Sequence, residues 1–280
     1  MEKRKINRVV VGQESVDGAG VKLRRLFGGR SAKDFDPFLL LDGFNSTDPD
    51  DYKKGFPWHP HRGIETVTYL ISGAIEHGDS LGNRGVIRGG ECQWMTAGSG
   101  ILHQEMPLES DHLLGVQLWV NLPQKEKMVD PAYRDISGEM ITTVEEEGVT
   151  IKIIAGFYGD QMGAIEKSYV AVRLLDVELE SNREWILQGD PSNALFCYVF
   201  TGEASFGGEV VGPTSIALME DGEHLVVKSG KKGVRFLVAE GPPLAEEIAW
   251  GGPIVMNTRE EVHQAFKELE EGTFIKKGYS

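Results

Sequence analysis

The stretch 56–107 constrains the fold more than any other part of the chain, because it holds candidate metal ligands in pairs two residues apart. His59 and His61 flank a proline near its start, and His103 and Glu105 stand near its end. In a β-strand, side chains two residues apart point to the same face of the sheet. Each pair therefore converges on one side of a sheet. If the two strands are neighbours, three imidazoles and one carboxylate can surround a single ion.

The mixed set of nitrogen and oxygen donors indicates a first-row transition metal, because calcium and magnesium prefer shells made of oxygen alone. Glu65 is an alternative source of the carboxylate. It follows His61 by four residues, so in an unbroken strand the two side chains would lie on the same face of the sheet. Gly63 can interrupt this register. Glu105 is better placed to act with His103, and Glu65 could instead orient a ligating imidazole. The residues alone leave this choice open.

Short apolar segments rich in β-branched residues follow one another along the chain. Glycine accounts for 35 of the 280 residues, which is typical of many turns between short strands, and turns are expected at Gly73, Gly78, Gly82 and Gly85. A spacing of about a dozen residues predicts an all-β protein built of sandwiches or barrels. Strands are expected at Val21–Phe27, Phe38–Leu41, Glu65–Ile71, Cys92–Met95, Ile101–Met106, Leu114–Leu122, Val149–Ile154, Val170–Leu179, Ala194–Thr201, Ser215–Met219, His224–Val227 and Gly233–Glu240.

One helix is expected near residues 258–270. Thr258 is a candidate N-cap and Glu261 follows three residues later, which is the arrangement of a capping box. The apolar residues of this segment fall on one helical face, which predicts that they are buried: Val262, Ala265, Phe266 and Leu269.

The composition changes between residues 123 and 147, where the chain is polar and lacks a strand pattern. This segment is interpreted as a linker or lid, with a domain boundary near residue 135. Residues 1–135 then form a metal-binding unit, and residues 136–280, with the helix, form a second all-β unit of similar length. No His-x-His pair follows residue 105, so all metal chemistry is expected in the first half.

The formal net charge of −14 disfavours binding to nucleic acid phosphates and to anionic membranes. Two cysteines without CxxC spacing, Cys92 and Cys197, exclude a disulfide framework and fit a reducing compartment. With no signal-peptide core and no apolar run long enough to span a bilayer, the protein is expected to be soluble and intracellular. One short basic cluster stands out as solvated surface or a binding site for a protein partner: Lys22, Arg24, Arg25 and Arg30.

Large apolar residues lie close to the ligands in the sequence. They form either ordinary core or a hydrophobic wall around the metal that suits a flat aromatic ligand. The residues are Phe56, Trp58, Trp94, Met95 and Trp119.

Several long motifs resemble the pirin family of cupin proteins, and they span nearly the whole chain. They are DPFLLLDGF (36–44), HPHRGIETVTYL (59–70), QWMTAGSGILHQEMP (93–107), QLWVNLP (117–123), EKMVDPAY (126–133) and VMNTREEVHQA (255–265). Trp58 and Ile64 depart from the residues usual in the family. Both are expected to touch the pocket wall, where they bear on substrate preference.

The resemblance implies a bicupin, in which two jelly-roll β-barrels stand in tandem and only the first holds a metal. By position, the family's ligands fall on His59, His61, His103 and Glu105, which favours Glu105 over Glu65. The implied cofactor is one divalent transition metal, with Fe²⁺ first and Ni, Mn, Cu, Co or Zn as the ions that related cupins accept.

The resemblance also implies an activity like that of quercetin 2,3-dioxygenases, acting on a small flavonol-like substrate and O₂ with Glu105 as the general base. The alternative is a regulatory protein without turnover, similar to a transcription cofactor, in which the metal's redox state alters a partner-binding surface. A metal-bound isomerase or sugar-binding cupin would need several polar residues in the pocket, and few are expected here. The implied location is cytoplasmic, or nuclear if the source cell has a nucleus.

Overall fold

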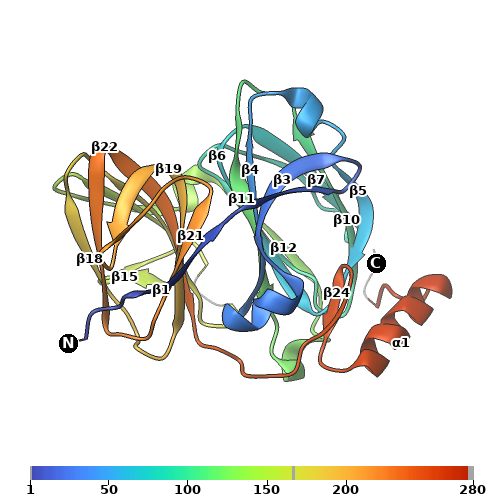
Figure 1. Cartoon of the computed structure of the whole chain (residues 1–280). Helices are drawn as coiled ribbons and strands as arrows, with labels where there is room; N and C mark the ends of the chain where they lie inside the picture. Colours follow the sequence, from blue (N-terminus) through green and yellow to red (C-terminus); the bar gives the residue numbers. More distant parts are fainter. Residues whose placement is uncertain (1, 166–167, 277–280) are drawn as a thin grey trace. The chain divides into compact units, whose positions relative to one another are not determined.

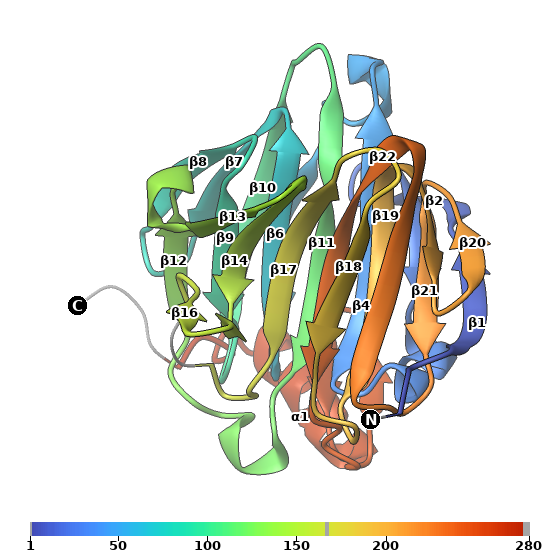
Figure 2. The same ribbon diagram turned by 90° about the vertical axis from the view of Figure 1, so that its left-hand side faces the viewer.

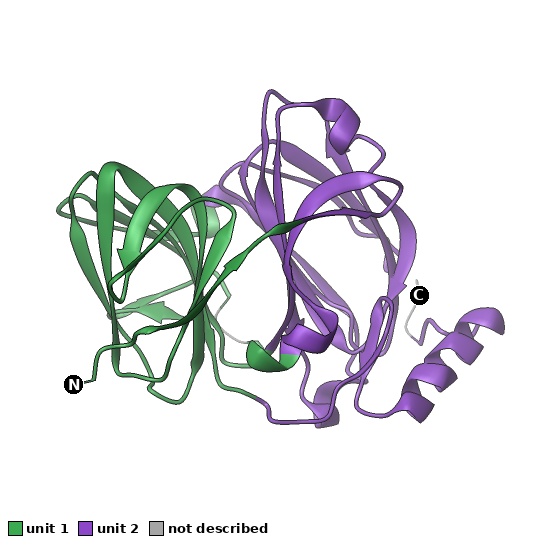
Figure 3. Cartoon of the chain, viewed as in Figure 1, with its two compact units in different colours: residues 1–13, 33–37, 139–243 green, residues 14–32, 38–138, 244–280 purple. Residues whose placement is uncertain are grey.

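The computed structural model describes residues 2–165 and 168–276, and strands dominate it (Figure 1). This confirms the expected all-β class. The chain divides into two compact units, and neither is a single continuous segment (Figure 3). Unit 1 comprises residues 1–13, 33–37 and 139–243, and unit 2 comprises residues 14–32, 38–138 and 244–280.

Two antiparallel sheets form unit 2. One has the order β12 (Ala132–Ile136), β9 (Cys92–Thr96), β6 (Ile64–Ser72), β11 (Leu113–Asn121), β4 (Phe38–Ser46), β3 (Val21–Phe27) and β2 (Gln13–Asp17). The other has the order β5 (Phe56–His61), β10 (Ile101–Leu108), β7 (Ala74–Asp79) and β8 (Arg84–Arg88). A hydrogen bond from Thr68 on β6 to Glu105 on β10 shows that the two sheets face each other. The interior between them therefore receives the inward side chains of β10.

Unit 1 is built on a nine-stranded sheet in which β19 and β22 run side by side (Figure 2). The order is β1 (Ile6–Val11), β21 (Ser215–Met219), β19 (Ala194–Phe206), β22 (His224–Gly241), β17 (Arg173–Leu179), β14 (Val149–Ala155) and β13 (Thr142–Glu146), with β18 (Glu184–Gln188) on β22 and β20 (Glu209–Val211) on β19. A small hairpin joins β15 (Phe157–Tyr158) to β16 (Gln161–Met162). Apolar side chains such as Trp185, Phe206 and Phe236 fill the core of this unit.

The glycine-rich stretch after residue 72 differs from its prediction as a series of turns. Gly78 lies inside β7 and Gly85 inside β8. A Cβ atom at position 85 would overlap the carboxylate of Asp135 on β12, so this glycine serves a close approach between strands of the two sheets of unit 2 rather than a turn. The strands predicted at 224–227 and 233–240 are likewise one continuous strand, β22.

The predicted linker or lid at residues 123–147 is tied into the sheets. It contains β12, which pairs with β9, and β13, which pairs with β14. Short 3₁₀ turns complete it, η3 (Gln124–Glu126) and η4 (Gly138–Met140), and two more occur earlier, η1 (Gly29–Asp34) and η2 (Pro49–Asp51). The segment is therefore a structural connection and not a lid.

The domain ranges of the structure differ from a simple cut near residue 135. The main division falls between Gly138 and Glu139, but β1 belongs to unit 1 through its pairing with β21. The C-terminal segment belongs to unit 2 and contains the hairpin of β23 (Ala249–Gly251) with β24 (Ile254–Met256), followed by α1 (Arg259–Glu270). Helix α1 packs on the β23–β24 hairpin and is grouped with it in unit 2, whereas the sequence prediction grouped it with the rest of residues 136–280.

Helix α1 has the expected start. Thr258 Oγ1 accepts a hydrogen bond from the backbone N–H of Glu261, and the Glu261 carboxylate accepts one from the backbone N–H of Thr258. Val262 and Ala265 are buried, whereas Phe266 is 39% exposed, so the buried face is narrower than predicted. No helix in the described part of the chain is both long enough and apolar enough to cross a lipid bilayer.

Candidate metal centre

Strands β5 and β10 are neighbours, and their register sets His103 directly opposite His59. His61 lies two residues from His59 on the same strand, so all three imidazoles point into unit 2. Their nearest ligand nitrogens lie within 4.8 Å of one another. Among the described residues, this is the one group of three or more His, Cys, Asp or Glu side chains with such spacing. The structure therefore brings three of the four predicted ligands together.

The hydrogen bonds of two of these histidines fix which nitrogen carries the proton. Nδ1 of His59 lies 2.9 Å from the carbonyl oxygen of Pro57, and Nδ1 of His61 lies 2.9 Å from that of Pro253. Since a carbonyl only accepts, each Nδ1 donates, and in the neutral ring Nε2 is left as a bare lone pair.

The Nε2 atoms face one another at short range. Nε2 of His59 lies 3.0 Å from Nε2 of His61 and 2.9 Å from Nε2 of His103. Two bare lone pairs at this distance repel each other. Two nitrogens that each lie about 2.1 Å from the same ion, with roughly a right angle between the two bonds, are about 3 Å apart. The donor set thus fits a cation placed between the three imidazoles.

Burial favours the neutral, ligand-ready form of these rings. It lowers the pKa of His61 to about 3, with a further contribution from the charge of His59. Burial also holds the pKa of His103 well below its ordinary value, and the neighbouring imidazoles add to this effect. Such rings do not need to lose a proton at neutral pH before they bind a metal.

Glu105 shares the inward face of β10 with His103, and it is buried. Its carboxylate accepts hydrogen bonds from Thr68 Oγ1 at 2.9 Å and from Gln117 Nε2 at 2.7 Å. The group of ligand atoms within 4.8 Å of one another contains the imidazoles and not this carboxylate. Glu105 is therefore held beside the imidazoles by two neutral donors.

Glu65 does not point toward the imidazoles. It lies three residues before Thr68 on β6, so the two side chains project from opposite faces of the sheet. Its carboxyl accepts a hydrogen bond from Thr96 at 2.6 Å, and burial raises its pKa. The structure thus removes Glu65 both as the alternative ligand and as the group that orients an imidazole.

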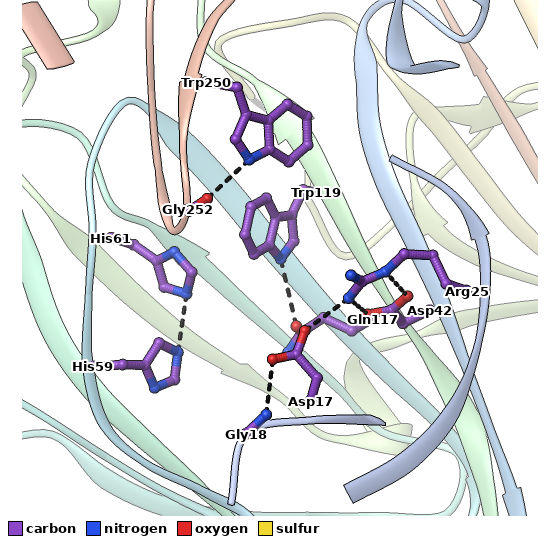
Figure 4. A network of polar contacts seen from close by, with 10 residues as sticks. All are labelled: Asp17, Gly18, Arg25, Asp42, His59, His61, Gln117, Trp119, Trp250 and Gly252. Atoms are coloured by element: carbon purple, nitrogen blue, oxygen red, sulfur yellow. Dashed lines mark hydrogen bonds and ion pairs between the residues drawn. The ribbon is translucent and has the colours of Figure 1, made fainter. Parts of the chain in front are cut away.

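A cavity of about 550 Å³ opens beside His59 and His61. Two indoles line it, those of Trp119 and Trp250, which stack with ring centroids 5.7 Å apart and an interplanar angle of 19° (Figure 4). Trp119 also meets His61 edge to face, with centroids 5.0 Å apart. The cavity therefore has a flat aromatic wall next to the imidazoles, suited to a planar ring.

A charged cluster lines another part of the cavity (Figure 4). Arg25 donates to both carboxylate oxygens of Asp42, at 2.9 and 2.7 Å, and to Asp17 at 2.8 Å. Burial alone would raise the pKa of Asp17, but hydrogen bonds from Arg25 and from the backbone N–H of Gly18 keep it below its ordinary value. The expectation of few polar residues in the pocket was therefore wrong. The carboxylates of Asp17 and Asp42 share the single guanidinium of Arg25, so this part of the cavity has more hydrogen-bond acceptors than donors.

The aromatic residues near the ligands in sequence divide between wall, core and surface. Phe56 and Trp119 line the cavity. Trp94 and Met95 are buried and lie outside its lining, and Trp58 is 52% exposed. Trp94 and Met95 are adjacent in β9, all of whose residues are buried, so sequence alternation alone does not separate wall from core.

Two contributors to the site come from the C-terminal hairpin, and sequence reasoning missed them. Pro253 supplies the carbonyl that fixes His61, and Trp250 supplies half of the aromatic wall. They lie nearly 200 residues after His61 (|i−j| = 192), and no local spacing links them to it. The motif at 255–265 was the only signal in their neighbourhood.

Comparison with known proteins agrees with this arrangement. Residues 20–120 match the family model described as pirin, and residues 174–275 match that of the pirin C-terminal cupin domain. A Pseudomonas aeruginosa protein, named provisionally as a quercetin 2,3-dioxygenase, is 42% identical over 96% of this chain and 97% of its own length. Human pirin is 37% identical over 95% of this chain and 92% of its own.

A solved structure shows the same architecture over nearly the whole chain. The crystal structure of quercetin 2,3-dioxygenase from Acinetobacter baumannii superposes with a TM-score of 0.88 at 31% sequence identity, and covers 97% of this chain and 98% of that one. The chain accordingly holds two cupin domains. With both family models matched and its relatives aligned almost end to end, the chain belongs to the pirin family.

Proposed function

We propose that this bicupin is a metal-dependent dioxygenase that opens the central ring of quercetin-type flavonols with O₂. The observation that carries the proposal is the convergence of three imidazole Nε2 atoms, two of them bare lone pairs, beside an aromatic-walled cavity. The names of relatives and of the solved neighbour support the same activity.

His59, His61, His103 and Glu105 hold one divalent transition metal in this proposal, with Fe²⁺ as the first choice. The bound ion would lower the pKa of the flavonol 3-hydroxyl and bring the substrate and O₂ together. The protein fixes the imidazoles through the carbonyls of Pro57 and Pro253.

Glu105 serves as the general base that removes the proton of the 3-hydroxyl. Thr68 and Gln117 each occupy one lone pair of its carboxylate, and a carboxylate offers about four such positions. A lone pair therefore remains for the substrate proton while the two donors keep the side chain in place.

The cavity suits a polyhydroxylated aromatic molecule. The stacked indoles of Trp119 and Trp250 offer a flat apolar face to its rings. Asp17 accepts hydrogen bonds and is already paired with Arg25, so substrate hydroxyls are better partners for this end than carboxylate or phosphate groups.

The regulatory alternative rested on a free basic cluster, and the structure pairs three of its four cations. Lys22 lies 2.7 Å from Asp51, Arg24 lies 3.0 Å from Glu14, and Arg25 binds Asp17 and Asp42. No observation on this cluster therefore favours a partner-binding role over turnover.

The test is aerobic incubation of the protein with quercetin after loading with iron, nickel, manganese, copper, cobalt or zinc in separate samples. We expect loss of the flavonol absorption band, with one O₂ consumed and one CO released per flavonol. The Glu105→Gln variant, which retains the shape of the side chain but lacks the base, should lose turnover. Absence of CO and of flavonol loss with every one of these metals would overturn the proposal.

A further inference from the structure

The three clustered imidazoles differ in how their outer nitrogens are held. Ligating histidines almost always donate their second ring N–H to a fixed acceptor, which sets the tautomer and the ring orientation. His59 and His61 donate to the carbonyls of Pro57 and Pro253. Nδ1 of His103 is buried, and it makes no hydrogen bond with any described residue. One of the three ligands thus lacks its orienting partner.

A second histidine beside His103 has a buried nitrogen in the same situation. His77 on β7 lies directly across from Glu105, and its neighbour Asp79 lies directly across from His103. The four side chains share one face of the two strands, and the rings of His77 and His103 are 5.4 Å apart. Nδ1 of His77 is also buried with no hydrogen-bonding partner among the described residues.

The surroundings of His77 fix which of its nitrogens can accept. Its Nε2 lies 3.3 Å from Oδ2 of Asp79. Hydrogen bonds from the backbone N–H groups of Leu81 and Asn83 and from the Asn83 side chain hold this carboxylate in place. A carboxylate only accepts, so Nε2 of His77 donates to it, and Nδ1 of the neutral ring is left as an acceptor.

The ring of His77 cannot easily turn away from this position. It stacks on Tyr133, with centroids 4.3 Å apart and an interplanar angle of 15°. Tyr133 in turn donates to Asp135. His77 is buried, and its ring centroid lies 5.4 Å from that of His103, so its acceptor nitrogen is confined to the interior of unit 2 near that ring.

We propose that His77 and Asp79 are positioning residues for the metal centre, and that one buried water joins Nδ1–H of His103 to Nδ1 of His77. The water accepts from His103 and donates to His77, so the hydrogen-bonded chain runs from His103 through the water and His77 to Asp79. This gives His103 the tautomer that the other two ligands obtain from carbonyls, with Nε2 free to bind. A single water in a buried polar site commonly makes two to four such bonds.

Three substitutions of His77 separate positioning from packing. Asn places an oxygen near the position of Nδ1, Gln places its amide near that of Nε2, and Phe retains the ring that stacks on Tyr133 but removes both nitrogens. Positioning predicts that His77→Asn retains metal affinity best, whereas His77→Gln and His77→Phe lose about 10- to 100-fold. A packing role predicts the reverse order, with His77→Phe closest to the wild type.

The readouts are the Co²⁺ and Ni²⁺ affinities of the metal-free protein, measured by competition with a chelator, and the visible spectrum of the Co²⁺ form. His112→Phe is the control, because His112 binds Asn45 away from the imidazole group, and its affinity and spectrum should stay at the wild-type values. Equal affinities in all three His77 variants, or the packing order, would overturn the inference. A crystal structure that shows the two Nδ1 atoms bonded to protein groups, without a water between them, would also overturn it.

The inference rests on the proposed metal ligands and not on flavonol turnover. If the wild-type protein binds neither Co²⁺ nor Ni²⁺, the ligand assignment fails and this inference fails with it. If it binds them and the His77 variants follow the packing order, only the inference about His77 and Asp79 fails.

Discussion

At the scale of single residues, the carbonyls of Pro57 and Pro253 orient two of the three clustered imidazoles. They turn two histidine rings so that bare nitrogens meet at 3.0 Å, an arrangement that a cation stabilises and that is unfavourable without one. Removing one imidazole relieves the repulsion and also removes a ligand. The metal-free and metal-bound proteins should therefore respond in opposite directions.

His59→Ala is accordingly expected to abolish metal retention through purification, while the metal-free variant is at least as stable as the metal-free wild type. Wild-type protein loaded with metal should unfold at a higher temperature than after chelation, since a ligand that binds only the folded state stabilises it. In His59→Ala, chelation should leave the unfolding temperature unchanged. Elemental analysis and thermal unfolding test this, with His112→Ala as the matched control. Stoichiometric metal in His59→Ala would contradict the assignment.

Thr68 offers a finer test of how Glu105 is held. Thr68→Val has nearly the same shape but removes the hydroxyl that donates to Glu105 at 2.9 Å, whereas Thr68→Ser retains it. We expect metal affinity and turnover to fall about tenfold in the Val variant, as is usual when a partner of a metal ligand is lost. The Ser variant should stay within a few-fold of the wild type. Equal values for the two variants would show that the hydroxyl does not position Glu105.

At the scale of elements, the sequence predicted those features that depend on residues close together in the chain. The alternation of side chains placed His59, His61 and His103 on common faces, and the capping box of Thr258 and Glu261 marked the start of α1. The strand positions of Gly78 and Gly85 were missed, because glycine signals a turn in sequence; at Gly85 the carboxylate of Asp135 occupies the space that a Cβ would need. That neighbour is known only once the sheet is built.

A partly buried ion pair holds helix α1 on the rest of unit 2, and it makes a prediction about pH. Arg62 donates to Glu268 at 2.7 Å, and Lys276 lies 2.8 Å from the same carboxylate. Burial opposes the charged form, but hydrogen bonds from Lys276, Gln264 and Arg62 outweigh it and lower the pKa of Glu268 from 4.5 to about 2. The unfolded chain binds a proton here at higher pH than the folded one, so this stabilisation is complete above pH 4.5 and is lost as pH falls toward 2.

The comparison of wild type with Glu268→Gln isolates this group from other carboxylates. At neutral pH the variant should be less stable, by up to about 3 kcal/mol, since one pKa unit corresponds to about 1.4 kcal/mol. The difference in unfolding free energy should shrink as pH falls through the window. Denaturant titrations of the metal-free proteins at several pH values measure it. A difference that does not change between neutral and acidic pH would contradict the role given to this pair.

At the scale of the whole molecule, each compact unit depends on a segment from the far end of the chain. Strand β1 pairs with β21 in unit 1, and the hairpin β23–β24 with α1 belongs to unit 2. Sequence reasoning divided the chain near residue 135, because pairing between distant segments leaves no local pattern. The consequence for function is that residues 244–280 complete the proposed metal site, whose imidazoles lie before residue 104.

Two truncations should therefore act differently on the same protein. Deleting residues 244–280 removes the Pro253 carbonyl that fixes His61, the Trp250 wall and the helix, and metal retention should be lost.

Deleting residues 2–11 removes β1 and the buried Arg4, which donates to three backbone carbonyls of unit 1. The unfolding temperature should then fall by about 2–4 °C for each kcal/mol lost, while Co²⁺ still gives the wild-type spectrum, because no proposed ligand or partner of a ligand lies in that segment. Circular dichroism confirms retained strand content in both proteins before metal is added. If the two truncations lose metal together, the site depends on the integrity of the whole chain rather than on its C-terminal segment.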